Sequence, residues 1–205
     1  MSATETFVHR FVPGESKRTL MVLHGTGGNE DDLLPVARML DPESALLSPR
    51  GKVLENGAPR FFRRLREGVF DEEDLVRRAH ELADFVAAAV KEHALDAAQV
   101  VAVGYSNGAN IASAMMLLRP EILRGAVLLR GQTPLVPEKL PDLSGKGVFL
   151  SSGKFDPIIG AENAAALAEM LRKAGADVTH KLLPSGHELT RVDIDDAREW
   201  LARFS

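Results

Sequence analysis

The 205-residue chain contains no cysteine, which excludes disulfide bonds, thiolate metal sites, iron–sulfur clusters and a cysteine nucleophile. It has no excess of basic residues: its formal net charge is −4, so we expect no nucleic-acid partner. It also lacks the run of roughly 18 apolar residues that a membrane span needs, since the longest near-continuous stretch is Ile111–Leu118. The first eleven residues have neither the charged start nor the apolar core of a signal peptide, so we expect a cytoplasmic protein.

The composition is that of an ordinary globular protein, with 45% hydrophobic and 26% charged residues. A chain of this length buries about 70% of its unfolded surface on folding, which is enough for a real core. It contains no internal repeat, low-complexity tract or Pro/Gly-rich linker. We therefore expect residues 1–205 to form one domain.

Short apolar runs alternate with longer segments of helical periodicity along the whole chain. The expected strands are Thr6–Val12, Thr19–His24, Ala45–Ser48, Gln99–Tyr105, Gly125–Leu129, Gly147–Ser151 and Asp177–Leu182. The expected helices are Glu30–Leu40, Glu72–His93, Asn107–Leu118, Ala161–Ala174 and Arg191–Phe204. This alternation predicts an α/β fold in which helices cover both faces of a mainly parallel sheet of about seven strands. The active site of such a sheet lies at the carboxyl ends of its strands.

The strongest motif is Gly104-Tyr105-Ser106-Asn107-Gly108, which has the form G-x-S-x-G. It stands where an expected strand runs directly into an expected helix. A sharp turn there would expose the Ser106 hydroxyl above the sheet and require small residues at positions 104 and 108. The motif therefore predicts Ser106 as a nucleophile, although a chance glycine–serine turn is the alternative interpretation.

A glycine-rich loop, His24-Gly25-Thr26-Gly27-Gly28-Asn29, follows an early strand. Hydrolases with this order of elements use a backbone N–H after that strand as one oxyanion donor, and the N–H after the nucleophile as the other. We therefore predict Thr26 and Asn107 as the two donors, with His24 bracing the loop. A phosphate-binding loop is the competing interpretation, but Glu30 breaks the G-x-G-x-x-G pattern.

The base and the acid are predicted from their places after the last two strands. Of the six histidines, His187 alone follows the final strand and precedes the final helix. Asp156 follows the preceding strand in a turn with Pro157, although a simple Asp-Pro turn is the alternative. The carboxylate would fix the imidazole tautomer, and the imidazole would take the Ser106 proton. His187-Glu188 begins a zinc motif that Arg191 breaks, so no metal is expected.

The chain resembles the phospholipase/carboxylesterase family of α/β-hydrolases. Four segments carry the resemblance: Leu23–Gly28, Gly104–Asn110, Phe155–Ile158 and Ser185–Leu189. It is most similar to the small bacterial carboxylesterases that include hydroquinone-stress hydrolases. The resemblance implies an α/β-hydrolase fold without a cap domain, hydrolysis of small-molecule esters without metal or cofactor, and frequent homodimers. Two positions depart from the pattern of the family: Gly160 stands where many relatives have a proline, and Gly131-Gln132-Thr133 is more polar than expected. The resemblance implies that the second segment borders the substrate pocket, so its polarity bears on substrate preference and Gln132 is a predicted substrate-binding residue.

Residues 50–70 carry no clear helix or strand pattern, and they combine six basic residues with Phe61, Phe62 and Phe70. Long loops of this kind are usually functional or disordered. The hypothesis is an aromatic pocket with a basic rim, in which Phe62 and Phe70 bind aryl or short acidic acyl esters. The common alternatives for such a segment are a solvated loop and a dimer contact.

Two other functions stay open. An acyl thioesterase or lysophospholipase would use the same three residues and differ in its acyl groove. A non-catalytic binding module on the same fold would have no need of Ser106, Asp156 and His187 together.

Overall fold

The computed structural model describes residues 7–204, and within them the chain forms one seven-stranded sheet and two small hairpins. The sheet has the order β1-β3-β2-β8-β9-β10-β11. All neighbouring strands are parallel except β1, which pairs antiparallel with β3. The strands of the sheet are β1 His9–Val12, β2 Thr19–Leu23, β3 Ala45–Pro49, β8 Val100–Tyr105, β9 Gly125–Leu129, β10 Gly147–Gly153 and β11 Asp177–Leu183. This is the mainly parallel sheet that the alternation of segments predicts.

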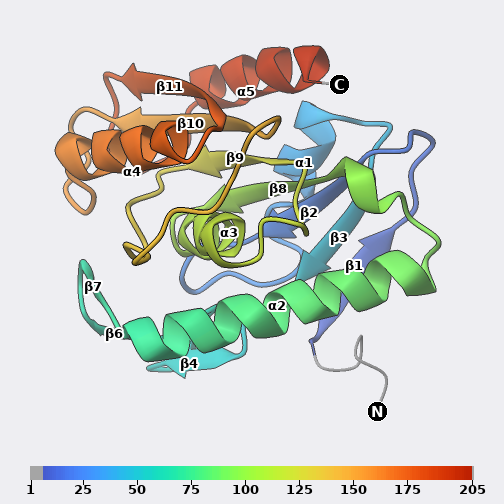
Figure 1. The fold of residues 1–205 in the computed structure, drawn as a ribbon, viewed down its shortest axis with the longest axis horizontal. Helices are drawn as coiled ribbons and strands as arrows, with labels where there is room; N and C mark the ends of the chain where they lie inside the picture. The colour runs from blue at the N-terminus through green and yellow to red at the C-terminus, as the bar shows by residue number, and fades with distance from the viewer. Residues whose placement is uncertain (1–6, 205) are drawn as a thin grey trace.

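Helices cover both faces of the sheet (Figure 1). The helices are α1 Leu34–Leu40, α2 Glu72–Glu92, α3 Asn107–Leu118, α4 Ala161–Lys173 and α5 Arg191–Arg203, with a 3₁₀ turn at Ala97–Gln99. Apolar side chains of α2, α3 and α4 pack in one core cluster, and those of α1 and α5 pack in a second cluster on the opposite face. Alternate residues of β8 enter the two clusters, which explains its uninterrupted apolar sequence.

Helix α1 begins at Leu34, four residues later than expected. The preceding residues form a turn in which Asn29 Oδ1 accepts from the N–H of Asp31, and Asp32 Oδ2 accepts from the N–H of Asn29. Pro35 then occupies the first turn, where its fixed φ and missing N–H are tolerated. Of the first expected strand, Thr6 lies outside the described residues.

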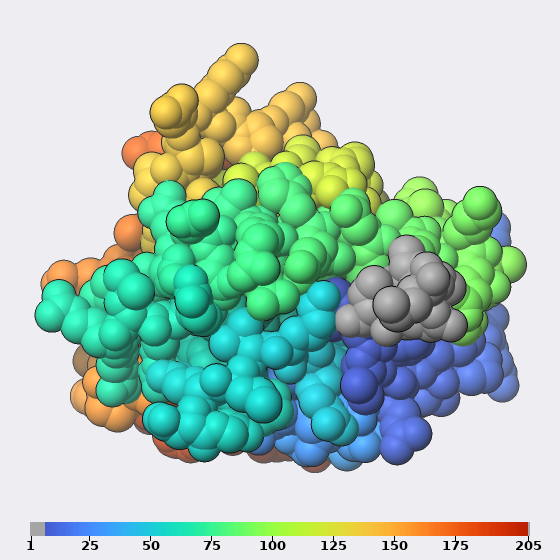
Figure 2. Space-filling model, turned by 90° about the horizontal axis from the view of Figure 1, so that it is seen from below, coloured from blue at the N-terminus to red at the C-terminus, as the bar shows by residue number. Residues whose placement is uncertain are grey.

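The segment 50–70 is not the irregular loop that we expected. It forms two hairpins, β4 Val53–Glu55 with β5 Ala58–Arg60, and β6 Arg64–Arg66 with β7 Val69–Phe70. The turn of the first hairpin is Asn56-Gly57, and both residues have positive φ. Two-residue hairpin turns of type I′ require positive φ at both central residues, which is why they favour Asn-Gly. The strands are too short to show a periodicity in sequence. In Figure 2 the hairpins, cyan to teal, form a continuous surface beside α2 in green.

No helix among residues 7–204 is long and apolar enough to cross a lipid bilayer. The carboxyl ends of β8, β10 and β11 lie at the same edge of the sheet, and the two hairpins between β3 and α2 line a cavity there.

Candidate active site

Ser106 stands in a sharp turn between β8 and α3. Its φ is +52°, in the left-handed region that side chains other than glycine rarely adopt. The N–H of Ser106 donates to Leu129 O at 2.8 Å, which ties the strained turn to β9. The flanking glycines are required by close approach, since a Cβ at Gly108 would lie 2.0 Å from Leu23 O. A Cβ at Gly104 would lie 2.5 Å from the backbone of Gly108.

The structure brings Ser106, His187 and Asp156 together from the ends of three strands. His187 Nε2 lies 2.9 Å from Ser106 Oγ, and His187 Nδ1 lies 2.8 Å from Asp156 Oδ2. The side chain of Asp156 is 1% exposed and that of His187 is 17% exposed. With Nδ1–H directed at the carboxylate, Nε2 is free to accept the serine proton. The arrangement can therefore perform nucleophilic catalysis with a general base.

Asp156 is held by its own turn. Its Oδ1 accepts from the N–H groups of Ile158 and Ile159 at 2.8 and 3.0 Å, leaving Oδ2 for the imidazole. A carboxylate fixed in this way selects one imidazole orientation.

The predicted oxyanion donors, Thr26 and Asn107, both border the cavity beside Ser106. Among residues 7–204, neither backbone N–H donates to another protein group. Their role as oxyanion donors stays a prediction. The side chain of Thr26 is held separately, because its Oγ1 accepts from Arg60 Nη1 at 2.6 Å. The N–H of Gly27 donates to Pro59 O at 2.9 Å, which fastens the glycine-rich loop to β5.

His24 connects the glycine-rich loop to the segment that follows β3. Its Nδ1 lies 2.7 Å from Gly25 O, and its Nε2 accepts from the N–H of Gly51 at 2.9 Å. The two contacts select the neutral tautomer with the proton on Nδ1. Burial lowers the pKa of His24 below its ordinary value, and hydrogen bonding to Gly25 opposes this only in part.

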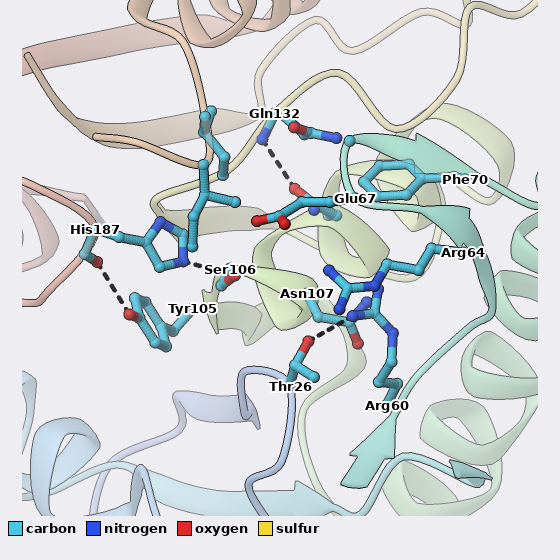
Figure 3. A pocket seen from close by; sticks show the side chains of 14 residues that line it. Thr26, Arg60, Arg64, Glu67, Phe70, Tyr105, Ser106, Asn107, Gln132 and His187 are labelled. Carbon is cyan, nitrogen blue, oxygen red and sulfur yellow. Dashed lines mark hydrogen bonds between the residues drawn. The ribbon is translucent and has the colours of Figure 1, made fainter. Parts of the chain in front are cut away.

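A cavity of about 280 Å³ borders Ser106 and His187 (Figure 3). Phe70 and Gln132 line it, as the sequence predicts, together with Arg60, Arg64 and Glu67. Phe62 does not line it, so its predicted contact with substrate is corrected. Its side chain is fully buried, and its ring meets the ring of Phe70 in a T-shaped contact with centroids 4.9 Å apart. Phe62 supports the wall from behind.

Three hydrogen bonds that shape the site were not predicted from the sequence, although one of them involves Asn107, a predicted oxyanion donor. The side-chain oxygen of Asn107 accepts from the N–H of Phe61 at 2.7 Å, and that of Asn110 accepts from the N–H of Gln132 at 2.9 Å. Tyr105 Oη donates to the carbonyl of His187 at 2.9 Å. The motif Gly104–Asn110 contains all three donors or acceptors, so its polar residues carried a signal besides the glycines.

Among residues 7–204, no three histidine, aspartate or glutamate side chains gather in a way that could hold a metal ion.

The model of the phospholipase/carboxylesterase family matches residues 13–205. The chain belongs to this family. That membership makes it a carboxylic ester hydrolase with the α/β-hydrolase fold, as the sequence motifs predicted. It is 47% identical over 192 residues to the putative hydrolase MhqD of Bacillus subtilis. The matched region covers 94% of this chain and 96% of MhqD.

Solved structures agree with this family. A carboxylesterase from Bacillus cereus is 45% identical with a TM-score of 0.94, over 96% of this chain and 93% of that one. A carboxylesterase from Mesorhizobium loti is 34% identical with a TM-score of 0.86, over 93% and 90% of the two chains. YahD, whose structure was solved with malic acid, is 32% identical in sequence with a TM-score of 0.90, over 96% of this chain and 98% of the YahD chain.

Proposed function

We propose that this hydrolase is a serine carboxylesterase that cleaves small to medium esters through an acyl-enzyme on Ser106. The observation that carries the proposal is the continuous chain of hydrogen bonds from Ser106 through His187 to Asp156, with links of 2.9 and 2.8 Å. His187 takes the Ser106 proton as the hydroxyl oxygen attacks the ester carbonyl. It then returns the proton to the departing alcohol, and the acyl group stays on Ser106.

The N–H groups of Thr26 and Asn107 stabilise the negative charge on the carbonyl oxygen in this account. Asn107 is the first residue of α3, so the positive end of that helix faces the same oxygen. Loss of one such donor typically costs on the order of 10²–10³ in rate. Water activated by His187 then hydrolyses the acyl-enzyme and regenerates the serine.

The size and lining of the cavity support short substrates. Its volume of about 280 Å³ lies just below the usual range for ligand pockets, which is roughly 300–1,000 Å³. Phe70 supplies an aromatic wall, in keeping with aryl esters. The charged residues of the lining are Arg60, Arg64 and Glu67, and both arginines pair with Glu55, so they support an acidic acyl group less strongly than Phe70 supports an aryl group. The YahD relative was solved with malic acid, itself a short acid.

An acyl thioesterase or lysophospholipase with the same residues is the second candidate, and the small cavity disfavours it. A series of p-nitrophenyl esters from acetate to decanoate, beside an acyl thioester, separates the two. We expect kcat/KM to fall as the acyl chain lengthens. A rise in kcat/KM with chain length, or a preference for the thioester, would favour the second candidate.

Homodimer formation, which the family resemblance implies, stays a prediction.

The direct test of the proposal is the turnover of Ser106→Ala on p-nitrophenyl acetate. We expect kcat to fall by about 10⁴-fold or more, because catalysis without the nucleophile retains only binding and oxyanion stabilisation. Thermal unfolding of the same variant checks that it folds. A folded Ser106→Ala enzyme with normal turnover would contradict the proposal.

A further inference from the structure

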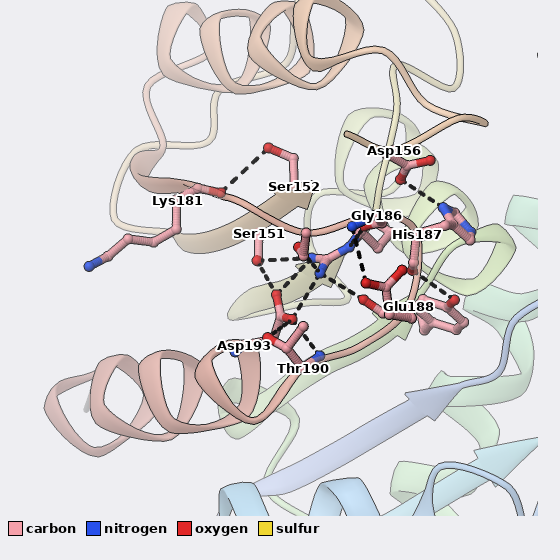
Figure 4. Close-up of polar contacts among 12 residues, drawn as sticks. Ser151, Ser152, Asp156, Lys181, Gly186, His187, Glu188, Thr190 and Asp193 are labelled. Carbon is pink, nitrogen blue, oxygen red and sulfur yellow. Dashed lines mark hydrogen bonds and ion pairs between the residues drawn. The ribbon is translucent and has the colours of Figure 1, made fainter. Parts of the chain in front are cut away.

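Three successive backbone carbonyls around His187 are each held by a side chain from another element. Arg130 Nε donates to Gly186 O at 3.0 Å, and Arg130 Nη2 donates to Glu188 O at 2.8 Å. Tyr105 Oη donates to the carbonyl between them, that of His187, at 2.9 Å. The backbone carbonyl of His187 and those of the residues before and after it are therefore all held by hydrogen bonds (Figure 4).

Arg130 is the centre of this arrangement, and it is completely buried. Its Nη1 and Nη2 donate to the two carboxylate oxygens of Asp193 at 2.7 and 2.9 Å. Its remaining contacts are with the hydroxyls of Ser151 and Ser185, at 3.1 and 3.0 Å. The guanidinium thus contacts six acceptors with five N–H groups, so one N–H of Nη2 is shared between two of them. A lysine, with three donors on one nitrogen, cannot span the same set.

Asp193 in turn is anchored in the first turn of α5. Its Oδ2 accepts from the N–H of Thr190 at 2.7 Å, while its own N–H donates to Thr190 Oγ1, and this reciprocal pair is a capping box. The Thr190 hydroxyl also donates to Asp193 Oδ2 at 2.7 Å. Figure 4 shows how the cluster gathers between the strand ends and the start of α5, next to the His187 loop. The loop is thus connected through Arg130 to the end of β9 on one side and to α5 on the other.

The backbone of Arg130 gives an independent sign of constraint. Its φ is +56°, a left-handed conformation that glycine or asparagine would adopt more easily. Residues held in such a conformation persist where surrounding contacts over-determine them, and they cluster at functional sites. Here the contacts are those of the guanidinium and of the N–H of Arg130, which donates to Ser151 O at 2.8 Å.

We propose that Arg130, with Tyr105, is a positioning residue that holds the Gly186–Glu188 backbone so that His187 Nε2 stays in register with Ser106. The proposal rests on the proposed function, because it assigns a role relative to the catalytic base. Arg130 does not line the cavity, so it acts on the reaction only through His187. Displacement of a catalytic group by about 1 Å can cost roughly 10²-fold in rate.

The test compares Arg130→Met and Arg130→Lys with the control Arg18→Met. Arg18 also links distant segments: its Nη1 donates to Asp41 Oδ2 at 2.9 Å, and its Nη2 donates to Phe204 O at 2.5 Å. It does not line the cavity, so it serves as a control for loss of stability alone. We expect Arg130→Met to lower kcat on p-nitrophenyl acetate by about 10- to 100-fold per folded molecule, with KM within about twofold. Ser106 labelling by a fluorophosphonate should slow by the same factor. Arg18→Met should lower the unfolding midpoint and keep kcat within about twofold.

Arg130→Lys and one further variant, Tyr105→Phe, keep the proposal testable if Arg130→Met does not fold. Arg130→Lys retains a charge for Asp193 but cannot donate to the carbonyls of both Gly186 and Glu188, so we expect it to fold with reduced kcat. Tyr105→Phe removes only the contact with His187 O, and we expect kcat to fall several-fold. In the wild type, the His187 Nδ1 proton should give a downfield NMR resonance that broadens or disappears in the Arg130 variants.

Wild-type kcat and labelling rate per folded molecule in both Arg130→Lys and Tyr105→Phe would overturn the proposal. So would an Arg130→Met enzyme whose activity falls only with its folded fraction, as in Arg18→Met. Ser106→Ala separates this failure from failure of the proposed function. If Ser106→Ala is inactive while the Arg130 and Tyr105 variants are fully active, only the positioning role is wrong.

Discussion

Asn107 Oδ1 accepts a 2.7 Å hydrogen bond from the backbone N–H of Phe61. This contact joins the first residue of α3, directly after the proposed nucleophile, to the segment between the two hairpins. Both groups are buried. One side chain thus fixes the distance between Ser106 and the wall of the cavity, while the N–H of the same residue remains available to an oxyanion.

Replacing Asn107 with alanine should lower the free energy of unfolding by about 1–3 kcal/mol, because the buried N–H of Phe61 loses its acceptor. The matched control is Asn163→Ala, which removes a similar 2.8 Å bond from Thr133 N–H at an exposed position. We expect the control to change stability by less than about 0.5 kcal/mol. Urea unfolding measures both values, and equal losses in the two variants would argue against a structural role of the Asn107–Phe61 contact.

The close approach at Gly108 predicts a severe effect of a single methyl group. In Gly108→Ala the new Cβ would lie 2.0 Å from Leu23 O, so strand and helix must separate. We expect a loss of about 3 kcal/mol in unfolding free energy. In Gly160→Ala the Cβ would meet nothing within 4 Å, and only the preference for Gly over Ala at the N-cap of α4 is lost, so stability should fall by about 1 kcal/mol or less. Comparable melting temperatures for the two variants would contradict this packing argument.

The buried imidazole of His24 predicts a stability that depends on pH. Burial lowers the pKa of His24 in the folded state, so the unfolded chain binds a proton more readily as pH falls through about 6.5. The free energy of unfolding should therefore decrease on acidification from about pH 7.5 towards pH 5. The non-titrating His24→Gln variant should show a shallower decrease over the same range. Parallel curves for wild type and variant would show that His24 does not contribute.

The ring of Phe70 in the cavity lining leads us to expect that the enzyme prefers aryl esters to alkyl esters. Phe70→Ala removes the aromatic wall of the cavity, and we expect kcat/KM to fall roughly tenfold on phenyl acetate and much less on ethyl acetate. Leu65→Ala is a control on the same hairpin, because Leu65 is exposed and does not line the cavity. Its two specificity constants should match those of the wild type. An equal change on both esters in Phe70→Ala would remove the case for aryl recognition.

Sequence reasoning reached the parts of the molecule whose patterns are local. The apolar strand before Ser106, the flanking glycines and the positions of Asp156 and His187 after their strands all stand in short stretches of sequence. Parallel strands then bring their carboxyl ends to one edge, so the fold class predicts that the three residues lie at the same edge. Their contact across β9 also depends on the strand order and on the loops after β10 and β11.

The parts that sequence reasoning missed depend on contacts between distant segments. The hairpins have strands of two or three residues, too short for a periodic signal, although Asn56-Gly57 marked one turn. The burial of Phe62 behind Phe70 depends on how those hairpins fold. The sequence offers no local signal that Arg130 is buried, because its partner Asp193 lies 63 residues later.

The most direct test of the proposed mechanism is the site at which a fluorophosphonate labels the native protein, determined by mass spectrometry of its peptides. The account predicts one label per chain, on the peptide that carries Ser106, with loss of esterase activity in proportion to labelling. It also predicts that His187→Asn is labelled far more slowly, because the serine loses its base. Labelling at another residue, or full turnover by protein labelled at Ser106, would contradict it.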